Sequence, residues 1–163
     1  MVNGMLELRT APAGDGAVAA FLAERGMAMV ARRGELVDAL TRPAVTAVED
    51  GDLVGVLSYD LGRVECEILT LFAARQWTGV GSALLEAVTD LASAAGCRRC
   101  WLVTTNDNVD ALRFYQRRGF RLRAVRCGAV DETRRALKPA IPLTGEYGIP
   151  LRDELELERD LVR

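Results

Sequence analysis

The chain has 163 residues, half of them apolar, and carries 21 lysines and arginines against 23 aspartates and glutamates, a formal net charge of −2. It contains no histidine, which excludes Ser-His-Asp and Cys-His nucleophiles and histidine-ligated zinc. The charge balance argues against nucleic-acid binding, and no apolar run approaches the roughly 18 residues of a membrane span. A general base must therefore be a carboxylate, a tyrosine, a cysteine, a lysine or water.

The length suits one domain spanning residues 1–163. Four cysteines, together with an N-terminus (Met1–Met5) that lacks the charged and apolar regions of a secretory signal, predict free thiols and a cytoplasmic location. Every cation except Lys138 is an arginine, which indicates a GC-rich, bacterial coding genome.

The N-terminal quarter predicts a strand and two helices. The strand covers Leu6–Thr10, and an amphipathic helix capped by Asp15 runs to about Gly26. A second short helix is expected over Glu35–Leu40, stopped by the Arg42-Pro43 pair.

An antiparallel meander follows. Its three strands are expected at Ala44–Glu49, Leu53–Tyr59 and Val64–Phe72. Asp50-Gly51 between the first two is a strong hairpin signal.

The second half alternates helices and strands. A helix over Gly79–Ala95 has one wide apolar face, and strand Cys100–Thr105 follows it. Asn108 caps a helix that runs to about Gly119, and Phe120–Arg126 is the next strand. An antiparallel meander followed by alternating helices and strands predicts a mixed α/β sheet covered by helices.

The tail over residues 127–163 has no assigned role. It predicts a turn or two of helix at Asp131–Leu137, a loop broken by proline and glycine, and a final strand at Leu155–Leu161. The alternation of leucine with Glu154, Glu156 and Glu158 is typical of an edge strand with solvated carboxylates. Such an exposed edge predicts a homodimer.

The segment Gln76-Trp77-Thr78-Gly79-Val80-Gly81-Ser82 joins a strand to a helix. Unpaired amides in such a turn, together with the helix dipole, suit an anion of the pyrophosphate type. A dinucleotide-binding fingerprint would need a third glycine where Leu84 stands, and no P-loop lysine follows. The glycine pair alone is a weak signal.

Two motifs in the expected order make the chain resemble the GNAT acyltransferase superfamily. The first is Gln76-x-x-Gly79-x-Gly81, which follows a strand of the form Leu69-x-Leu71. The second is Asn108-x-x-Ala-x-x-Phe-Tyr115-x-x-x-Gly-Phe120. The resemblance implies the GNAT fold, an α+β architecture with a mostly antiparallel twisted sheet and helices on both faces.

The resemblance also implies acetyl-CoA as co-substrate, a primary amine of a small molecule, peptide or protein as acceptor, and no metal. Amides over Gln76–Ser82 would hold the pyrophosphate, and main-chain groups of Leu71, Phe72 and Ala73 would pair with the pantetheine arm. Asn108 would contact the pantetheine or cap its helix. Tyr115 would protonate the departing thiolate, although without the motif it reads as an aromatic side chain packed on a helix face.

Val80 and the Trp77-Thr78 pair stand where relatives often carry cations, which leaves Arg75 and the helix N-terminus to supply positive charge. Glu65 and Glu67, two residues apart on one strand, share a sheet face. That face either supplies the general base or is simply solvated.

Cys97-x-x-Cys100 has no second pair to complete a zinc site, so we expect small buried hydrophobes there. Two other functions stay open for the whole chain. One is transfer of a different acyl group, and the other is a non-catalytic acyl-CoA-binding module.

Overall fold

The structure is a computed structural model that describes residues 4–161. Its described part divides into two compact units, the first made of residues 4–30, 38–100 and 161, the second of Ala31–Val37 and Trp101–Asp160. The expected absence of a secretory signal rests on Met1–Met5, and residues 1–3 lie outside the described part. No helix within residues 4–161 combines the length and the hydropathy that crossing a membrane requires.

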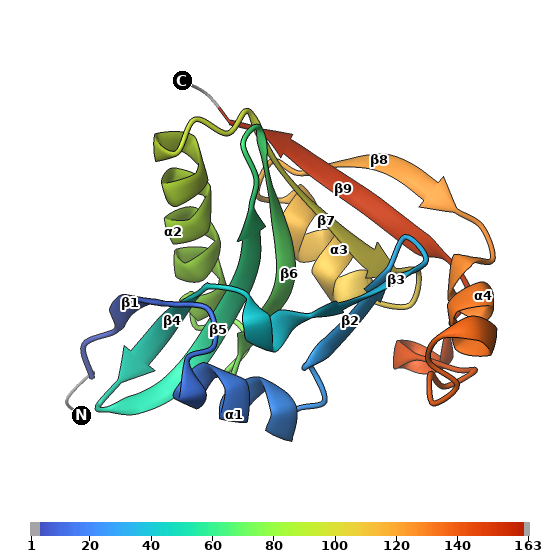
Figure 1. The fold of residues 1–163 in the computed structure, drawn as a ribbon, viewed down its shortest axis with the longest axis horizontal. Helices are drawn as coiled ribbons and strands as arrows, with labels where there is room; N and C mark the ends of the chain where they lie inside the picture. Colours follow the sequence, from blue (N-terminus) through green and yellow to red (C-terminus); the bar gives the residue numbers. More distant parts are fainter. Residues whose placement is uncertain (1–3, 162–163) are drawn as a thin grey trace. The chain divides into compact units, whose positions relative to one another are not determined.

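The first unit contains a sheet with the strand order β1-β4-β5-β6 (Figure 1). These strands are β1 (Glu7–Ala11), β4 (Ala44–Glu49), β5 (Asp52–Leu61) and β6 (Glu65–Ala73), and each neighbouring pair is antiparallel. The predicted meander is confirmed. Asp50 and Gly51 both have positive φ, 53° and 88°, as a tight two-residue hairpin turn requires.

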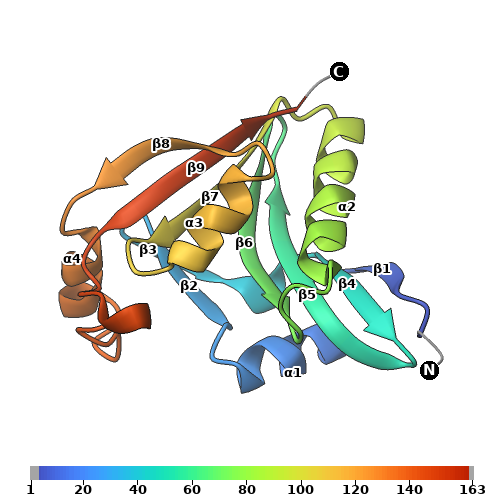
Figure 2. The same cartoon turned by 180° about the vertical axis from the view of Figure 1, so that it is seen from behind.

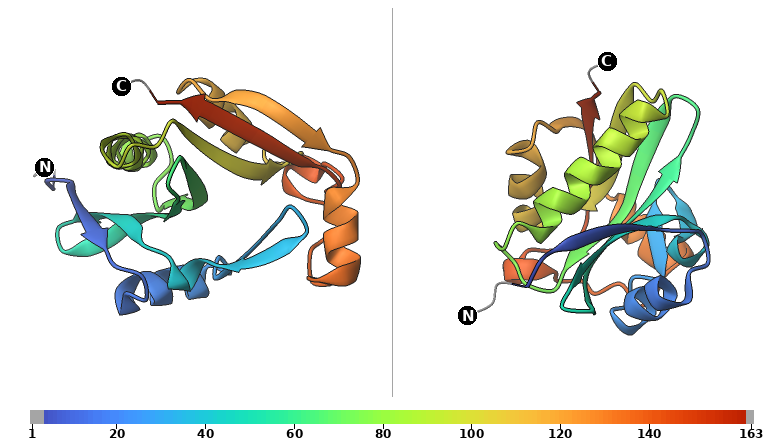
Figure 3. Two further views of the ribbon diagram at one scale, coloured as in Figure 1. Left: turned by 45° about the horizontal axis from the view of Figure 1, so that its top comes forward. Right: turned by 90° about the vertical axis from the view of Figure 1, so that its left-hand side faces the viewer.

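Helices α1 (Gly16–Glu24) and α2 (Val80–Ala94) cover opposite faces of this sheet (Figure 3). The Asp15 carboxylate caps α1 by accepting a hydrogen bond from the Val18 amide at 3.0 Å. On the α1 face, the Phe21 and Phe72 rings meet edge to face at 5.5 Å. On the α2 face, a Cβ added to Gly55 of β5 would lie 2.8 Å from the Val80 side chain, so the glycine allows the helix to approach closely.

The second unit contains the strand order β7-β9-β8, with two helices. The elements are β7 (Arg99–Thr105), α3 (Val109–Gln116), β8 (Arg121–Arg126), α4 (Ala129–Ala136) and β9 (Glu154–Asp160). The first two residues of β7 belong to the first unit. Figure 2 shows α3 lying across these strands and α4 at the end of β8 and β9.

The predicted helix over Glu35–Leu40 is wrong. The structure has a hairpin there, β2 (Met29–Arg32) and β3 (Glu35–Asp38), followed by a 3-10 turn, η1 (Ala39–Thr41). Arg33 and Gly34 form its turn with φ of 50° and 75°. The run is too short for its apolar pattern to separate a helix from a strand, and the Arg33-Gly34 turn decides in favour of strands.

The prediction that the last strand lies at an edge with solvated carboxylates is also wrong. β9 lies between β7 and β8, and Glu154, Glu156 and Glu158 are only 2%, 3% and 7% exposed. Arginines of β8 face them, so the alternating carboxylates form the inner side of the strand. The edge on which the homodimer was predicted is therefore not at β9.

The loop between α4 and β9, which includes a second 3-10 turn, η2 (Glu146–Gly148), is tied to the second unit. The Asp107 carboxylate accepts the Glu146 amide at 2.9 Å, and the Asn106 amide group binds Pro150 and Arg152 main-chain atoms. Arg134 of α4 donates to the Ile141, Pro142 and Leu151 carbonyls. The loop is therefore interrupted by proline and glycine but is fixed in place by hydrogen bonds from side chains.

Candidate active site

The predicted anion site lies at the N-terminus of α2. Gly79 is the N-cap residue, in a left-handed conformation with φ 87° and without a side-chain cap. The first amides of a helix have no acceptor within the helix, and they lie at the positive end of its dipole. Gly79 places no side chain over the first turn of α2, and a Cβ built on it would have nothing within 4 Å. The Val80 side chain itself is buried, so only its amide would serve.

The residues before this cap form a tight, exposed turn. The Thr78 hydroxyl donates to the Arg75 carbonyl at 2.9 Å, and Trp77 is 73% exposed with a positive φ of 66°. The Arg75 guanidinium, expected to supply charge for phosphates, is paired with the Glu49 carboxylate of β4. Both side chains are partly solvated, so this pair is a weak competitor for a phosphate ligand.

The end of β6 carries the residues predicted to hold the pantetheine arm. Leu71, Phe72 and Ala73 are half-buried and lie opposite Leu57, Val56 and Gly55 of β5. Because Gly55 also touches α2, the strand end and the helix N-terminus are held in one packed arrangement within the first unit.

The two candidate general bases on β6 have different surroundings. Glu65 is partly exposed and ion-paired with Arg99, whose Nη2 lies 2.9 Å from its carboxylate. Glu67 is buried, with 6% of its surface exposed. The structure therefore separates a paired surface carboxylate from a buried one, a difference that the two-residue spacing did not predict.

Tyr115, the candidate general acid, lies in the second unit near the C-terminal end of α3. Its ring meets Phe114 and Phe120 edge to face, at 5.1 and 5.4 Å, and it is 7% exposed. Burial raises the pKa of the Tyr115 phenol above its ordinary value, so the group keeps its proton at neutral pH. The packing role is thus present, and it preserves the protonated form that a proton donor needs.

Asn108 caps α3. Its side-chain oxygen accepts a hydrogen bond from the Ala111 amide at 3.2 Å. Of the two roles predicted for this residue, the structure shows the capping one.

The cysteines of the Cys97-x-x-Cys100 motif are buried, as is Cys66, while Cys127 is exposed. A hydrogen bond with Cys100 and burial both raise the pKa of the Cys66 thiol. The expected small buried hydrophobes fit this arrangement. Among residues 4–161 no group of three or more cysteine and carboxylate side chains is arranged to hold a metal.

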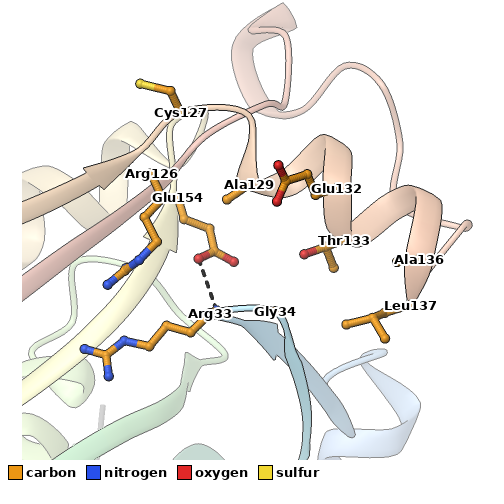
Figure 4. A pocket seen from close by; sticks show the side chains of 10 residues that line it. All are labelled: Arg33, Gly34, Arg126, Cys127, Ala129, Glu132, Thr133, Ala136, Leu137 and Glu154. Atoms are coloured by element: carbon orange, nitrogen blue, oxygen red, sulfur yellow. Dashed lines mark hydrogen bonds between the residues drawn. The ribbon is translucent and has the colours of Figure 1, made fainter.

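A cavity of about 750 Å³ in the second unit was not predicted. Its wall includes Arg33 of the β2–β3 turn, Glu132 of α4 and Glu154 of β9 (Figure 4). One signal in the sequence concerned the pairing of β8 with β9, at the opposite end of the two strands from this cavity. The alternating arginines of β8, Arg121 and Arg123, match the alternating carboxylates of β9 and indicate that the two strands pair through charge.

The fold is a mixed α/β architecture in which a helix begins directly after the last strand of the meander. The model of the acetyltransferase (GNAT) family matches residues 9–120. The chain belongs to this family. It is an acyltransferase by family, and the resemblance read from the two motifs is confirmed.

Relatives and solved structures agree with this assignment. The chain is 45% identical to the Bacillus subtilis protein YdhI over 107 residues, 66% of each chain, and 32% identical to streptothricin acetyltransferase of Streptomyces lavendulae over 117 residues, 67% of this chain and 61% of that one. It thus spans about two thirds or less of these relatives' length.

Two solved structures share the fold. An IAA acetyltransferase from Bacillus cereus has a TM-score of 0.74 at 22% identity, covering 96% of this chain and all of that one. A GNAT family acetyltransferase from Elizabethkingia anophelis with acetyl-CoA bound has a TM-score of 0.69 at 17% identity, covering 96% and 98%. The predicted GNAT fold is confirmed.

Proposed function

We propose that this protein is an acetyl-CoA-dependent N-acetyltransferase that acts on a primary amine. The observation that carries the proposal is the open N-terminus of α2, capped by left-handed Gly79 directly after the meander strand. Family membership and the acetyl-CoA-bound structure of similar fold support the choice of co-substrate. Relatives from Mycobacterium bovis and Bacillus subtilis that are named N-acetyltransferases support transfer to nitrogen.

In this proposal the amides from Gln76 to Ser82 bind the pyrophosphate, and main-chain groups of Leu71 to Ala73 bind the pantetheine arm. A neutral acceptor amine attacks the thioester carbonyl, forming a C–N bond, and collapse of the oxyanion breaks the C–S bond. Tyr115 gives its proton to the thiolate. Glu65, Glu67 or a water molecule takes the proton of the amine.

We further propose that the two units work as one domain, because the family match over residues 9–120 includes parts of both. A cytoplasmic location is proposed on the four free cysteines, three of them buried.

A thiol-release assay with acetyl-CoA and a panel of amines, aminoglycosides and peptides tests the activity. Release with at least one amine supports the proposal. Turnover only with a longer acyl-CoA would identify a different acyl transfer, and tight CoA binding without release for any amine would identify a binding module.

Calorimetry on Gly81→Val tests the loop assignment. The added side chain stands in the first turn of α2, where the phosphate must approach, so we expect CoA binding to be lost. Normal CoA affinity in this variant would refute the assignment.

The homodimer predicted from the sequence needs a different surface. β8 ends the strand order, and it exposes Leu122 and Val125 by 51% and 56%. We propose β8 as the edge of any homodimer. Sedimentation that gives a monomeric mass at micromolar concentration would end this proposal.

A further inference from the structure

Trp77 presents a large aromatic side chain beside the proposed pyrophosphate site. It is 73% exposed, and its main chain has a φ of 66°, in the left-handed region that residues other than glycine rarely occupy. A bulky residue in that region costs free energy and persists only where its surroundings fix it. The chain therefore holds a strained residue here without gaining the stabilisation that burial of an indole would give.

The turn that carries Trp77 is fixed from within and lies next to the start of α2. The Thr78 hydroxyl closes the turn by donating to the Arg75 carbonyl at 2.9 Å. Trp77 precedes the Gly79 cap by two residues, so the two Cα atoms lie at most about 7.6 Å apart. A group attached to a pyrophosphate on the first turn of α2 is therefore within reach of the indole.

Side-chain charge around this turn favours an anion only weakly. Arg75 pairs with Glu49 at the end of β4. The hairpin turn that follows Glu49 adds the carboxylates of Asp50 and Asp52. Between Arg75 and Arg98 the sequence has no lysine or arginine, so α2 carries none. The loop and α2 thus offer phosphates their main-chain amides and one guanidinium that is already paired.

Beyond the pyrophosphate, an acyl-CoA ends in an adenosine that carries a 3′-phosphate. A phosphate is bound best by cations and charge-assisted hydrogen bonds, whereas an adenine base has an aromatic face that stacks on another ring. The loop and α2 supply no second cation for the 3′-phosphate. A ring that is to stack on a ligand has to be accessible, as Trp77 is.

We propose that the Trp77 indole stacks on the adenine of the acyl-CoA, so that the loop recognises the nucleotide by its base rather than by its 3′-phosphate. This inference rests on the proposed use of acetyl-CoA. It adds a side-chain contact to a loop whose other expected contacts are main-chain amides. It also defines the class of donor, which is an acyl thioester of an adenine nucleotide with or without the 3′-phosphate.

Calorimetry with CoA, dephospho-CoA and 4′-phosphopantetheine tests the inference on the full chain. The first two ligands share the adenine and differ in the 3′-phosphate, and the third lacks the whole adenosine. The wild-type protein is expected to bind CoA and dephospho-CoA within about threefold of each other, because solvated charge pairs contribute little. It is expected to bind 4′-phosphopantetheine more weakly than either.

Trp77→Asn removes the ring and keeps the turn, because asparagine tolerates the left-handed conformation. This variant is expected to bind CoA and dephospho-CoA more weakly on the order of 10–100-fold, the range that stacking of a base on an aromatic ring provides. Its affinity for 4′-phosphopantetheine stays unchanged. Tyr147→Asn is the matched control, since Tyr147 is also aromatic, 70% exposed and at a positive φ of 55°, but belongs to the second unit. It keeps all three affinities.

Fluorescence gives a readout that does not depend on activity. The chain has two tryptophans, and the other one, Trp101, is only 7% exposed. We expect CoA and dephospho-CoA to quench the emission of Trp77, and 4′-phosphopantetheine to leave it unchanged. Trp77→Phe is expected to keep the CoA affinity within about threefold, because phenylalanine also stacks on bases, and to lose the quenching.

Three results would overturn the inference. The first is equal CoA affinity in wild type and Trp77→Asn. The second is a loss in Trp77→Asn that all three ligands share, which would show that the residue only shapes the turn. The third is CoA binding more than about tenfold tighter than dephospho-CoA in wild type, which would show recognition of the 3′-phosphate through charge.

The thiol-release assay separates this inference from the proposed function. If no amine releases thiol but CoA and dephospho-CoA bind in a manner that needs Trp77, the acetyl transfer fails and the stacking contact stands. If amines are acetylated while Trp77→Asn binds CoA normally, the function stands and the stacking contact is wrong. A wild-type protein that binds none of the three ligands would contradict both.

Discussion

Burial and neighbouring charges set the protonation states of individual side chains in this protein. Tyr115 lies between two aromatic rings, and the low polarity around it favours the neutral phenol. Glu156 is equally buried but is surrounded by two arginines, which keep it charged. Two titratable groups of one unit are thus held in opposite protonation states by their neighbours.

Replacing Tyr115 by Phe is expected to lower kcat on the order of 10²-fold, because the leaving thiolate loses its proton donor. Acetyl-CoA affinity should stay close to wild type, since the ring and its packing are kept. Steady-state kinetics and calorimetry measure the two quantities. An unchanged kcat would remove Tyr115 from the mechanism and leave it a packing role.

The lowered pKa of Glu156 predicts that the free energy of unfolding depends on pH. Burial opposes its ionisation, but hydrogen bonds from Arg33 and Arg126 outweigh burial and lower the pKa of Glu156. Its contribution is fully present above the unfolded-state pKa of about 4.3 and is lost as the pH falls through the lower folded-state pKa. Glu156→Gln should cost about 1–3 kcal/mol at neutral pH, with the difference from wild type shrinking below about pH 4.

Urea unfolding across this pH range measures the effect. Asp160→Asn is the control, because its ion pair with Arg121 is largely exposed and is worth little. A cost for Glu156→Gln that does not change with pH would show that packing, not charge, holds the residue.

At the scale of elements, α2 is positioned by the sheet beneath it. Gly55 of β5 is the contact point, because any Cβ there would meet Val80 and Leu84 at under 3.0 Å. Val80 is the first residue of α2, so the contact also places the amides of the predicted pyrophosphate loop. Core packing and the proposed anion site therefore both depend on Gly55.

Gly55→Ala is expected to push α2 off the sheet, lower the free energy of unfolding by about 1–3 kcal/mol and weaken CoA binding. Gly16→Ala is a matched control, since a Cβ there meets nothing within 4 Å and its φ is not in the left-handed range. Denaturant unfolding and CoA calorimetry give both readouts. Normal CoA affinity in a folded Gly55→Ala protein would show that the helix N-terminus tolerates the shift.

Most helices and strands could be predicted from residue patterns alone. The apolar face of α2 spans four turns, and clear turn signals separate the meander strands. Such long periodic patterns identify a helix or a strand without knowledge of the tertiary contacts. The β2–β3 hairpin was missed because Leu36 and Val37 form too short an apolar run to show a period. Its turn residue Arg33 is also not a typical residue for positive φ.

At the scale of the whole molecule, the two compact units are expected to unfold together. The family match runs through parts of both, as one domain requires. Thermal unfolding should show a single transition, and acetyl-CoA at about 100 times its Kd should stabilise the protein by about 2.7 kcal/mol. Calorimetric scanning with and without acetyl-CoA measures this, and two separate transitions would show that the units are independent domains.

The sequence by itself determined the family and most of the helices and strands, because motifs, turns, caps and periodic faces depend on neighbouring residues, while the roles of the loop from Gln76 to Ser82 and of Tyr115 stay predictions. It also showed that the two faces of the last strand differ. Only the tertiary structure decided which face is inside. Burial of Glu154, Glu156 and Glu158 depends on groups of β8 and the β2–β3 turn, distant in the chain, that compensate lost hydration. The cavity beside Glu154 exists for the same reason, since its walls come from three separate segments.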